Sequence, residues 1–280
     1  MRSAWWVFVA AVIVLCPPRL FSQGGPPFRS DDPDTPGNKH WEINMGFVGD
    51  RSPFQGSYDT PILDVNFGVG NRLQLKYEIP WSIEETRGTP GSVIGGLGSS
   101  LLGAKYRFYQ RHSKTKQDDQ GEREIKYALS LYPQVLLSHS DRSVQRGVAE
   151  PAPQMLLPLE ASVNIGWLRA SGEIGYWFTS KDAPNSWIFG VVLGHEFKKD
   201  TELYLELYDQ REVRAPGQNL RESTVGIGGR VPIVRGQWLR LIGMVGHGIS
   251  VSTPTNGQPT WIAYVGLQFL SDRKRRHLDQ

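Results

Sequence analysis

Histidines are the side chains best suited to bind a metal ion or to act as a general base. The sequence has six, which are His40, His112, His139, His195, His247 and His277. A metal site needs two or three such ligands at helical or strand spacing, and these six are not paired in that way. The stretch His139-Ser140-Asp141 has the residue types of a hydrolase, but neighbours on a strand point to opposite faces. The sequence therefore predicts no catalytic residue, no metal site and no cofactor.

Asp31, Asp32 and Asp34 form an acidic cluster that could bind a cation. The cluster lacks the spaced ligands and the terminal Glu of a calcium loop. It lies in residues 23–38 (QGGPPFRSDDPDTPGN), where Pro, Gly and Asp favour turns. We therefore interpret the cluster as a solvated turn, and residues 23–38 as an irregular lead-in segment.

Charged residues elsewhere recur at every second position, which is the period of a β-strand. In residues 72–81, for example, Arg72, Lys76 and Glu78 alternate with apolar residues. A strand places the two sets on opposite faces. The polar set comprises Arg72, Lys76, Glu78, Lys105, Arg107, Glu160, Arg169, Glu173, Glu202, Tyr204, Glu206, Tyr208, Arg230 and Arg240.

Burying so many charges in a dry core would be very costly. A water-filled lumen removes this cost, so we expect the polar set to form the wall of an open channel. Arg72, Lys76, Lys105 and Arg107 should form one basic patch there, because their strands are sequence neighbours. The alternative is that opposite charges pair across the interior and plug it.

Twelve segments have the alternating pattern and a length that suits strands crossing a bilayer at a tilt. They are residues 40–48, 61–69, 72–81, 99–109, 125–138, 154–165, 169–179, 186–197, 201–209, 221–233, 237–249 and 260–270. The predicted fold class is therefore all-β: a closed antiparallel up-and-down transmembrane β-barrel of about 12 strands, over residues 39–270.

The connections between these segments alternate in length, as the short periplasmic turns and longer outside loops of outer-membrane barrels do. The short ones are 70–71, 166–168, 198–200 and 234–236, and the longer ones are 49–60, 82–98, 139–153, 180–185, 210–220 and 250–259. The connection 110–124 breaks this alternation, because it is long where a short periplasmic turn is expected. We interpret it as either an extended hairpin or a disordered turn. With the N-terminus in the periplasm, the longer loops face outside.

Tryptophans stand near the ends of the strands, where an interfacial aromatic girdle would need them. They are Trp41, Trp81, Trp167, Trp187, Trp238 and Trp261. Strand ends of soluble β-proteins also attract Trp as a cap on the core, which is the alternative interpretation.

The N-terminus is typical of an export signal, because Arg2 precedes the apolar run 4–16, which is too short to span a bilayer. We expect residues 1–22 to be a signal peptide cleaved after Ser22; a retained anchor is the alternative. The mean hydropathy of -0.37 argues strongly against a helical membrane protein. The net charge of +3 gives no reason to expect nucleic acid as a partner.

The final strand, 260–269 (TWIAYVGLQF), is similar to the C-terminal signal read by the barrel-assembly machinery, which commonly ends in Phe. The chain continues with residues 271–280 (SDRKRRHLDQ), which we interpret as a basic periplasmic tail.

Several stretches resemble an outer-membrane transporter family named for the meta-cleavage pathway of phenol degradation, the MetA-pathway barrels. They are 27–36 (PFRSDDPDTP), 40–44 (HWEIN), 63–80 (LDVNFGVGNRLQLKYEIP), 96–108 (GLGSSLLGAKYRF) and 172–176 (GEIGY). The resemblance covers most of the chain and implies a barrel in the outer membrane, in contact with its lipid, that is sometimes linked to uptake of aromatic or other hydrophobic compounds.

We therefore expect passive diffusion of a small, hydrophobic or aromatic solute through the lumen. A structural or adhesive barrel with a plugged lumen is the alternative. An outer-membrane lipid hydrolase is a weaker one, because such barrels resemble one another in a His-x-Ser on one strand, and this sequence has none.

Overall fold

The computed structural model describes residues 26–271, apart from residues 54, 89–90, 118–120, 166–167, 180–183, 198–200, 214–220, 235–237 and 253–260. The predicted signal peptide, Trp167 and the tail beyond Ser271 lie outside the described residues. The strands are β1 (Trp41–Arg51), β2 (Gln55–Val69), β3 (Leu73–Thr86), β4 (Ser92–Leu97), β5 (Ser100–Gln117), β6 (Gly121–Leu131), β7 (Gln134–Leu137), β8 (Gln154–Ile165), β9 (Leu168–Phe178), β10 (Ser186–Glu196), β11 (Glu202–Glu212), β12 (Arg221–Pro232), β13 (Leu239–Ser252) and β14 (Trp261–Leu270).

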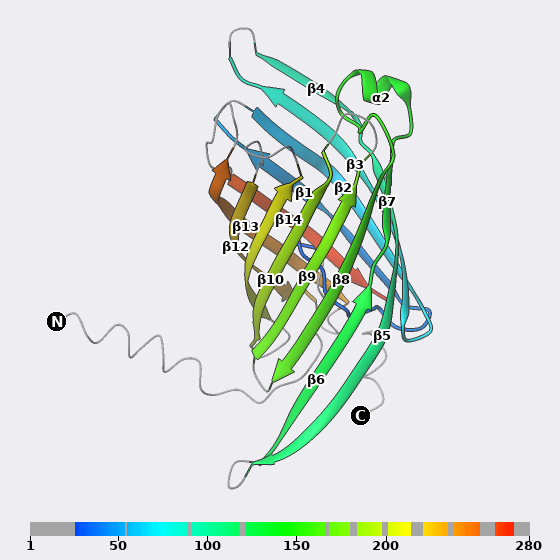
Figure 1. Cartoon of the computed structure of the whole chain (residues 1–280), viewed down its shortest axis with the longest axis vertical. Helices are drawn as coiled ribbons and strands as arrows, with labels where there is room; N and C mark the ends of the chain where they lie inside the picture. The colour runs from blue at the N-terminus through cyan, green and yellow to red at the C-terminus, as the bar shows by residue number, and fades with distance from the viewer. Residues whose placement is uncertain are drawn as a thin grey trace, which may run out of the picture.

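The strands form one closed antiparallel sheet (Figure 1). Strand β1 pairs with both β2 and β14, and β3 pairs with β5, so that no gap is left in the wall. Strands β4 and β5 are separated by two residues and continue one another along β3, while β7 continues β6 between β5 and β8. Because each of these two pairs occupies one position, the fourteen strands fill twelve positions around the barrel wall. The predicted fold class is confirmed.

Alternation of side chains sets the two faces of the wall. In β11, Leu203, Leu205 and Leu207 are exposed on the outside, whereas the glutamates and tyrosines between them are buried. This is the inverse of a soluble core, because the buried face is the polar one. It suits a wall with hydrocarbon outside and polar contacts inside. Among the described residues, no helix is long and apolar enough to cross a membrane.

The two ends of the barrel differ. At the lower end in Figure 1, β5 and β6 continue as a paired hairpin, with Gln110 opposite Ala128 and Gln117 opposite Gly121. The connection predicted over 110–124 is thus the extended hairpin rather than a disordered turn. At the upper end lies α2 (Asp141–Gln145), one short turn of helix that the strand pattern did not predict.

Candidate functional site

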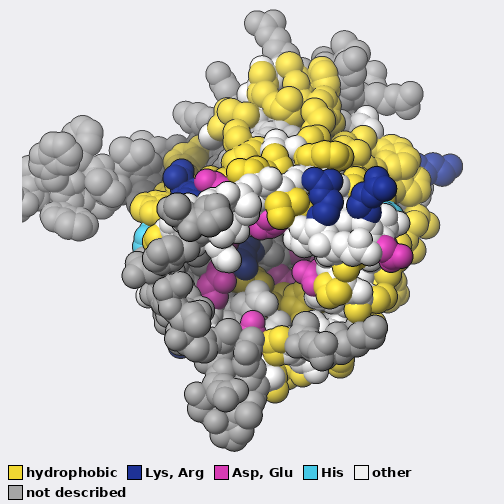
Figure 2. Space-filling view, turned by 90° about the horizontal axis from the view of Figure 1, so that it is seen from above, with side chains coloured by type: hydrophobic (Ala, Val, Ile, Leu, Met, Phe, Trp, Pro, Cys, Tyr) yellow, Lys and Arg dark blue, Asp and Glu magenta, His cyan; other side chains and the backbone are white. Residues whose placement is uncertain are grey.

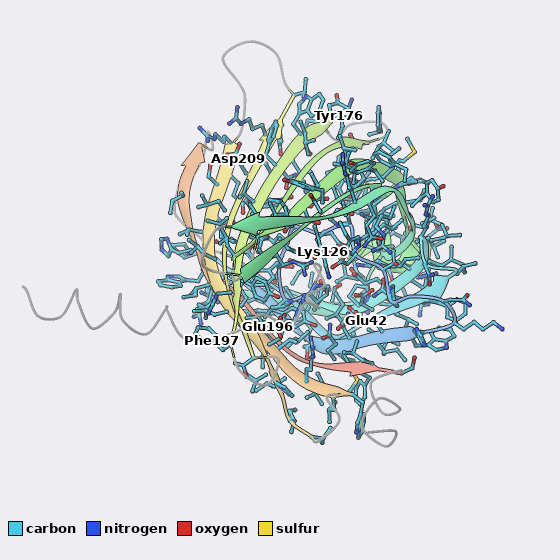
Figure 3. All side chains as sticks on the ribbon, turned by 90° about the horizontal axis from the view of Figure 1, so that it is seen from below. Glu42, Lys126, Tyr176, Glu196, Phe197 and Asp209 are labelled. Atoms are coloured by element: carbon cyan, nitrogen blue, oxygen red, sulfur yellow. The ribbon has the colours of Figure 1, made fainter. Side chains whose placement is uncertain are left out.

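The interior of the barrel holds most of the predicted wall residues. Ten of them are buried, namely Lys105, Arg107, Glu160, Glu173, Glu202, Tyr204, Glu206, Tyr208, Arg230 and Arg240. Lys76 and Glu78 form an ion pair of 2.8 Å, and Arg169 is bound to two carboxylates. Figure 3, seen from below, shows side chains crowding the interior, where Glu42 is labelled, while Phe197 lies at the outer surface.

Arg72 differs from the expectation, because it is exposed in the turn that precedes β3. Its backbone oxygen accepts a hydrogen bond of 2.8 Å from the amide of Arg107. The expected basic patch is also absent from this wall. Lys76 is paired with Asp64 and Glu78, and Lys105 lies 3.5 Å from Glu160. Asp64 on the neighbouring strand β2, Glu78 on β3 itself and Glu160 on β8 neutralise the two lysines. The sequence comparison considered only the basic residues of the two strands and left these carboxylates out.

The lead-in segment, described here over residues 26–38, lies inside the lumen. It forms turns and bends but no helix or strand. Its backbone amides bind wall carboxylates: Ser30 N–H donates to Glu206 Oε1 at 2.8 Å, and Asp31 N–H donates to Glu173 Oε2 at 3.0 Å. A segment without a ladder of its own thus satisfies its buried donors on the barrel wall.

The side chains of the lead-in segment bind wall cations. Lys105 Nζ donates to Asp31 Oδ1 at 2.7 Å. Arg169 donates to Asp32 and, at 3.0 Å, to Asp34 Oδ2. Asp32 is 1% exposed, so the prediction of a solvated turn is wrong. Acidic turn residues are usually solvated, but here Lys105, Arg169 and Arg107 of the wall replace the water.

The pKa values of Asp31 and Asp32 shift in opposite directions. Burial disfavours the charged form of Asp31, but the ammonium groups of Lys105 and Lys76 outweigh it and hold the pKa of Asp31 below its ordinary value. Burial dominates at Asp32, whose pKa is raised although Arg169 lies against it. Asp31 and Asp32 are therefore held by different balances of burial and charge.

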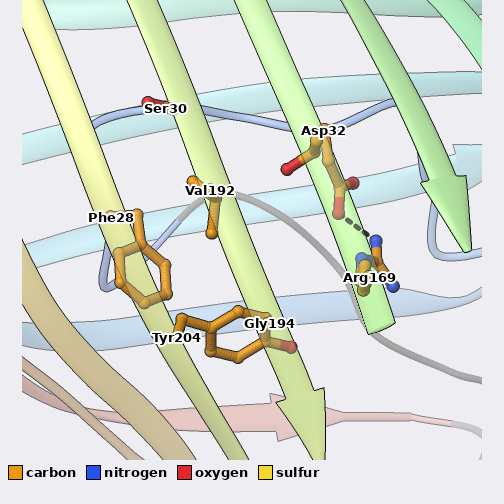
Figure 4. A pocket seen from close by; sticks show the side chains of 8 residues that line it. Phe28, Ser30, Asp32, Arg169, Val192, Gly194 and Tyr204 are labelled. Carbon is orange, nitrogen blue, oxygen red and sulfur yellow. Dashed lines mark hydrogen bonds and ion pairs between the residues drawn. The ribbon is translucent and has the colours of Figure 1, made fainter. Parts of the chain in front are cut away.

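An apolar cluster in the lumen surrounds Phe28 of the lead-in segment. The ring of Phe28 meets that of Tyr204 edge to face, with 5.2 Å between centroids. The cluster is completed by Val192, Ile242, Met244, Ile262 and Tyr264. A cavity of about 10 Å³ lies between Phe28 and the Asp32–Arg169 ion pair, with room for about one water molecule (Figure 4). The lead-in segment thus fills the lumen here almost completely.

Two glycines make room for the lead-in segment. A Cβ at Gly190 would lie 2.0 Å from Ser30 Oγ and 2.7 Å from Ser30 Cβ. A Cβ at Gly68 would lie 1.8 Å from the backbone oxygen of Gly37. At that second position the segment leaves the lumen, and Asn38 Oδ1 accepts a hydrogen bond from the amide of Gly70.

The remaining interior contains further polar contacts. Asn44 donates to Asp64 at 3.0 Å, and Gln74 donates to Asn66 at 2.7 Å, across neighbouring strands. Arg230 donates to the backbone oxygen of Pro26 at 3.1 Å. In the described part of the chain, the polar groups of the wall thus bind one another as well as the lead-in segment.

Above the lead-in segment the barrel is hollow. Figure 2, seen from the upper end, shows an opening with acidic and basic side chains inside it. Arg29 stacks on the ring of Tyr208 at 4.1 Å and forms an ion pair of 2.9 Å with Glu222. Tyr208 also belongs to a small apolar cluster with Leu156 and Ile188.

The predicted aromatic girdle lies at two levels. Trp81, Trp187 and Trp261 are exposed toward the upper ends of their strands. Trp41, at the lower end of β1, is exposed and packs on Phe67 with 4.4 Å between ring centroids. Trp238 lies just before β13, also at the lower end. The interfacial interpretation stays a prediction.

A serine and a histidine, two residue types found in hydrolase sites, are in contact although the sequence did not predict it. Ser100 Oγ lies 2.5 Å from His139 Nε2 and donates to Tyr77 Oη at 3.1 Å. Ser100 is 1% exposed, so a substrate carbonyl has no approach to its hydroxyl. Ser140 instead caps α2 by accepting from the amide of Ser143. The spacing of Ser100 and His139 in the sequence carried no signal, because the two residues are 39 positions apart and meet only through the pairing of β5 with β7.

Comparison with known proteins shows the fold. No family model and no curated protein matches the sequence, so the resemblance to the MetA-pathway barrels stays a prediction. The chain is similar to the COG4313 outer membrane channel from Pseudomonas putida F1, with a TM-score of 0.64 and 12% identity over 87% of this chain and 100% of that one. The KdgM porin gives a TM-score of 0.46 with 13% identity, over 81% of this chain and 98% of that one. The CymD monoaromatic hydrocarbon channel gives 0.44 with 6% identity, over 85% and 90%.

Proposed function

We propose that this protein is an outer-membrane channel for small solutes, closed in the described conformation by its own lead-in segment. One observation carries the proposal. The wall is a closed barrel with an apolar outer face, and a large part of what fills its lumen is a segment without regular structure rather than side chains of the strands. Such a segment can leave without breaking the sheet, because its backbone hydrogen bonds run to side chains of the wall.

A barrel with a permanently plugged lumen is the second candidate. The ion pairs of Lys105 and Arg169 with the lead-in segment and the tight packing around Phe28 favour it. The two candidates differ in one respect: a channel conducts once the lead-in segment is removed, and a filled structural barrel does not.

Deletion of residues 26–38 tests the proposal in planar lipid bilayers. We expect conductance to rise by about tenfold or more, because a closing conformation that dominates the population is removed. A synthetic peptide with the sequence of residues 26–38 should restore closure when it is added from the lower end. A variant with Arg211→Gln, on the exposed upper rim, is the control. Conductance equal to that of the full chain would reject the channel and favour the plugged barrel.

The solute and the surroundings belong to the same proposal. The solutes are small and hydrophobic or aromatic, as in the MetA-pathway family that the sequence resembles. The wall is in contact with outer-membrane lipid, and the barrel-assembly machinery inserts it. The upper end in Figure 1 faces outside and the lower end faces the periplasm. Fractionation that recovers the protein in the soluble periplasm would contradict this part.

A further inference from the structure

We propose that the lumen contains a binding site for a solute that combines an aromatic ring with a carboxylate, and that the lead-in segment occupies this site as an internal mimic. The inference rests on the proposed channel function, because it names the class of solute that would use the lumen.

The ring part of the site is the slot around Phe28. Phe28 is 8% exposed and belongs to the lead-in segment, whereas the rest of the cluster belongs to the wall. Withdrawal of the segment would therefore leave an apolar space of about one aromatic ring, bordered by Tyr204 and Met244. Apolar cavities of this size take up small aromatic molecules.

The carboxylate part of the site is next to the ring slot. Arg169 binds Asp32 and Asp34, and Arg107 Nη1 lies 3.4 Å from Asp34 Oδ1. Phe28, Asp32 and Arg169 line one small cavity (Figure 4). The ring slot and Arg169 thus border the same cavity, and a single solute would have to span it to meet both. The guanidinium group suits a carboxylate because its N–H donors can bind both oxygens.

The wall also selects against a solute that has only one of the two groups. A ring without a carboxylate would leave the buried cation of Arg169 without the partner that the lead-in segment now supplies. A carboxylate without a ring would leave the apolar slot around Tyr204 empty. Glu173 and Glu206 accept backbone amides of the segment, so a hydroxyl or amide donor on the solute would fit beside them.

Tethering makes the segment a strong competitor. A covalently attached ligand has an effective concentration in the millimolar range, so the solute should bind much more weakly to the full chain than to a chain without residues 26–38. Coupling between the two is reciprocal, and a bound solute must favour the undocked segment by the same factor. The solute would therefore open the channel that it uses.

Calorimetric titration with benzoate in detergent tests the inference on the variant lacking residues 26–38. We expect saturable binding, about tenfold or more tighter than to the full chain. Acetate, which lacks the ring, and benzyl alcohol, which lacks the carboxylate, should bind at least about tenfold more weakly. Arg169→Gln in the same variant should weaken benzoate by a similar factor, and Arg211→Gln should not change it.

Heat-modifiable migration on a gel verifies that each variant is folded. If the deletion does not fold, Phe28→Ala combined with Asp32→Ala and Asp34→Ala in the full chain removes the ring and both carboxylates that bind Arg169, and the titration is repeated there. Absence of benzoate binding up to about 10 mM, which corresponds to less than about 3 kcal/mol of binding free energy, overturns the inference. Equal binding of benzoate, acetate and benzyl alcohol also overturns it.

Conductance of the same variant separates this inference from the proposed function. A variant that conducts but does not bind benzoate leaves the channel intact and rejects the site. A variant that binds benzoate but does not conduct rejects the channel and leaves the site.

Discussion

Gly190→Ala should displace the lead-in segment from the lumen. The new methyl group would lie 2.0 Å from Ser30 Oγ and 2.7 Å from Ser30 Cβ, where ordinary contacts are 3.4–4 Å. Rotation of the Ser30 side chain moves its hydroxyl away but leaves its Cβ in place. The backbone of Ser30 must therefore move by about 0.7 Å or more, away from the Glu206 carboxylate that binds its amide at 2.8 Å.

The size of the effect follows from these contacts. Overpacking of a tight interior costs about 1–3 kcal/mol, and a weakened hydrogen bond to a charged group lies in the same range. A shift of about 1–3 kcal/mol changes the ratio of undocked to docked segment by about 5- to 150-fold. The barrel itself should stay equally stable, because the methyl group meets only the lead-in segment within van der Waals distance, apart from Glu173 Cβ at 3.8 Å.

Trypsin cleavage after Arg29 measures the undocked population, since a protease needs an accessible extended segment. Mass spectrometry of the shortened chain should show cleavage about 5- to 150-fold faster in Gly190→Ala than in the wild type. Gly172→Ala is the matched control, because its Cβ would have only the backbone oxygen of Gly190 nearby, at 3.6 Å.

A compensating change makes the prediction stricter. Ser30→Gly removes the atoms that collide with the new methyl group, so the double variant should return to slow cleavage. A wild-type cleavage rate in Gly190→Ala would refute the docking geometry. Fast cleavage that Ser30→Gly does not reverse would mean that the methyl group acts elsewhere.

Three further outcomes follow from the same contacts. Phe28→Ala should also speed cleavage after Arg29, because docking of the segment loses up to the roughly 3–5 kcal/mol that a buried aromatic side chain contributes. The unfolding temperature of the barrel should not fall. An unchanged cleavage rate would show that Phe28 does not anchor the segment. Leu205→Arg, on the outer face, should destabilise the folded protein in bilayers by about 2–4 kcal/mol in a denaturant titration, and no change would argue against lipid at that face. An epitope tag within residues 87–91 should be reachable on intact cells, whereas a tag at Asn71 should not; the reverse result would invert the orientation.

The sequence by itself determined the barrel. Alternation such as that of Leu203, Leu205 and Leu207 with their polar neighbours is a local property, because successive residues of a strand face opposite sides. Strand β8 accordingly occupies residues 154–165, as the pattern predicted. The inward direction of Lys105, Glu160 and Arg230 followed from the same periodicity.

Only the tertiary structure decided what fills the lumen. Pro, Gly and Asp dominate residues 26–38 and are typical of turns, so the composition of the segment did not predict its burial. Asp32 is buried because Arg169, more than a hundred residues away in the chain, supplies the charge that water would otherwise supply. The contact of Ser30 with Gly190 is equally distant in sequence. Periodicity predicts which way a side chain points, but the partner that it meets depends on the closure of the barrel, which brings distant strands around one segment.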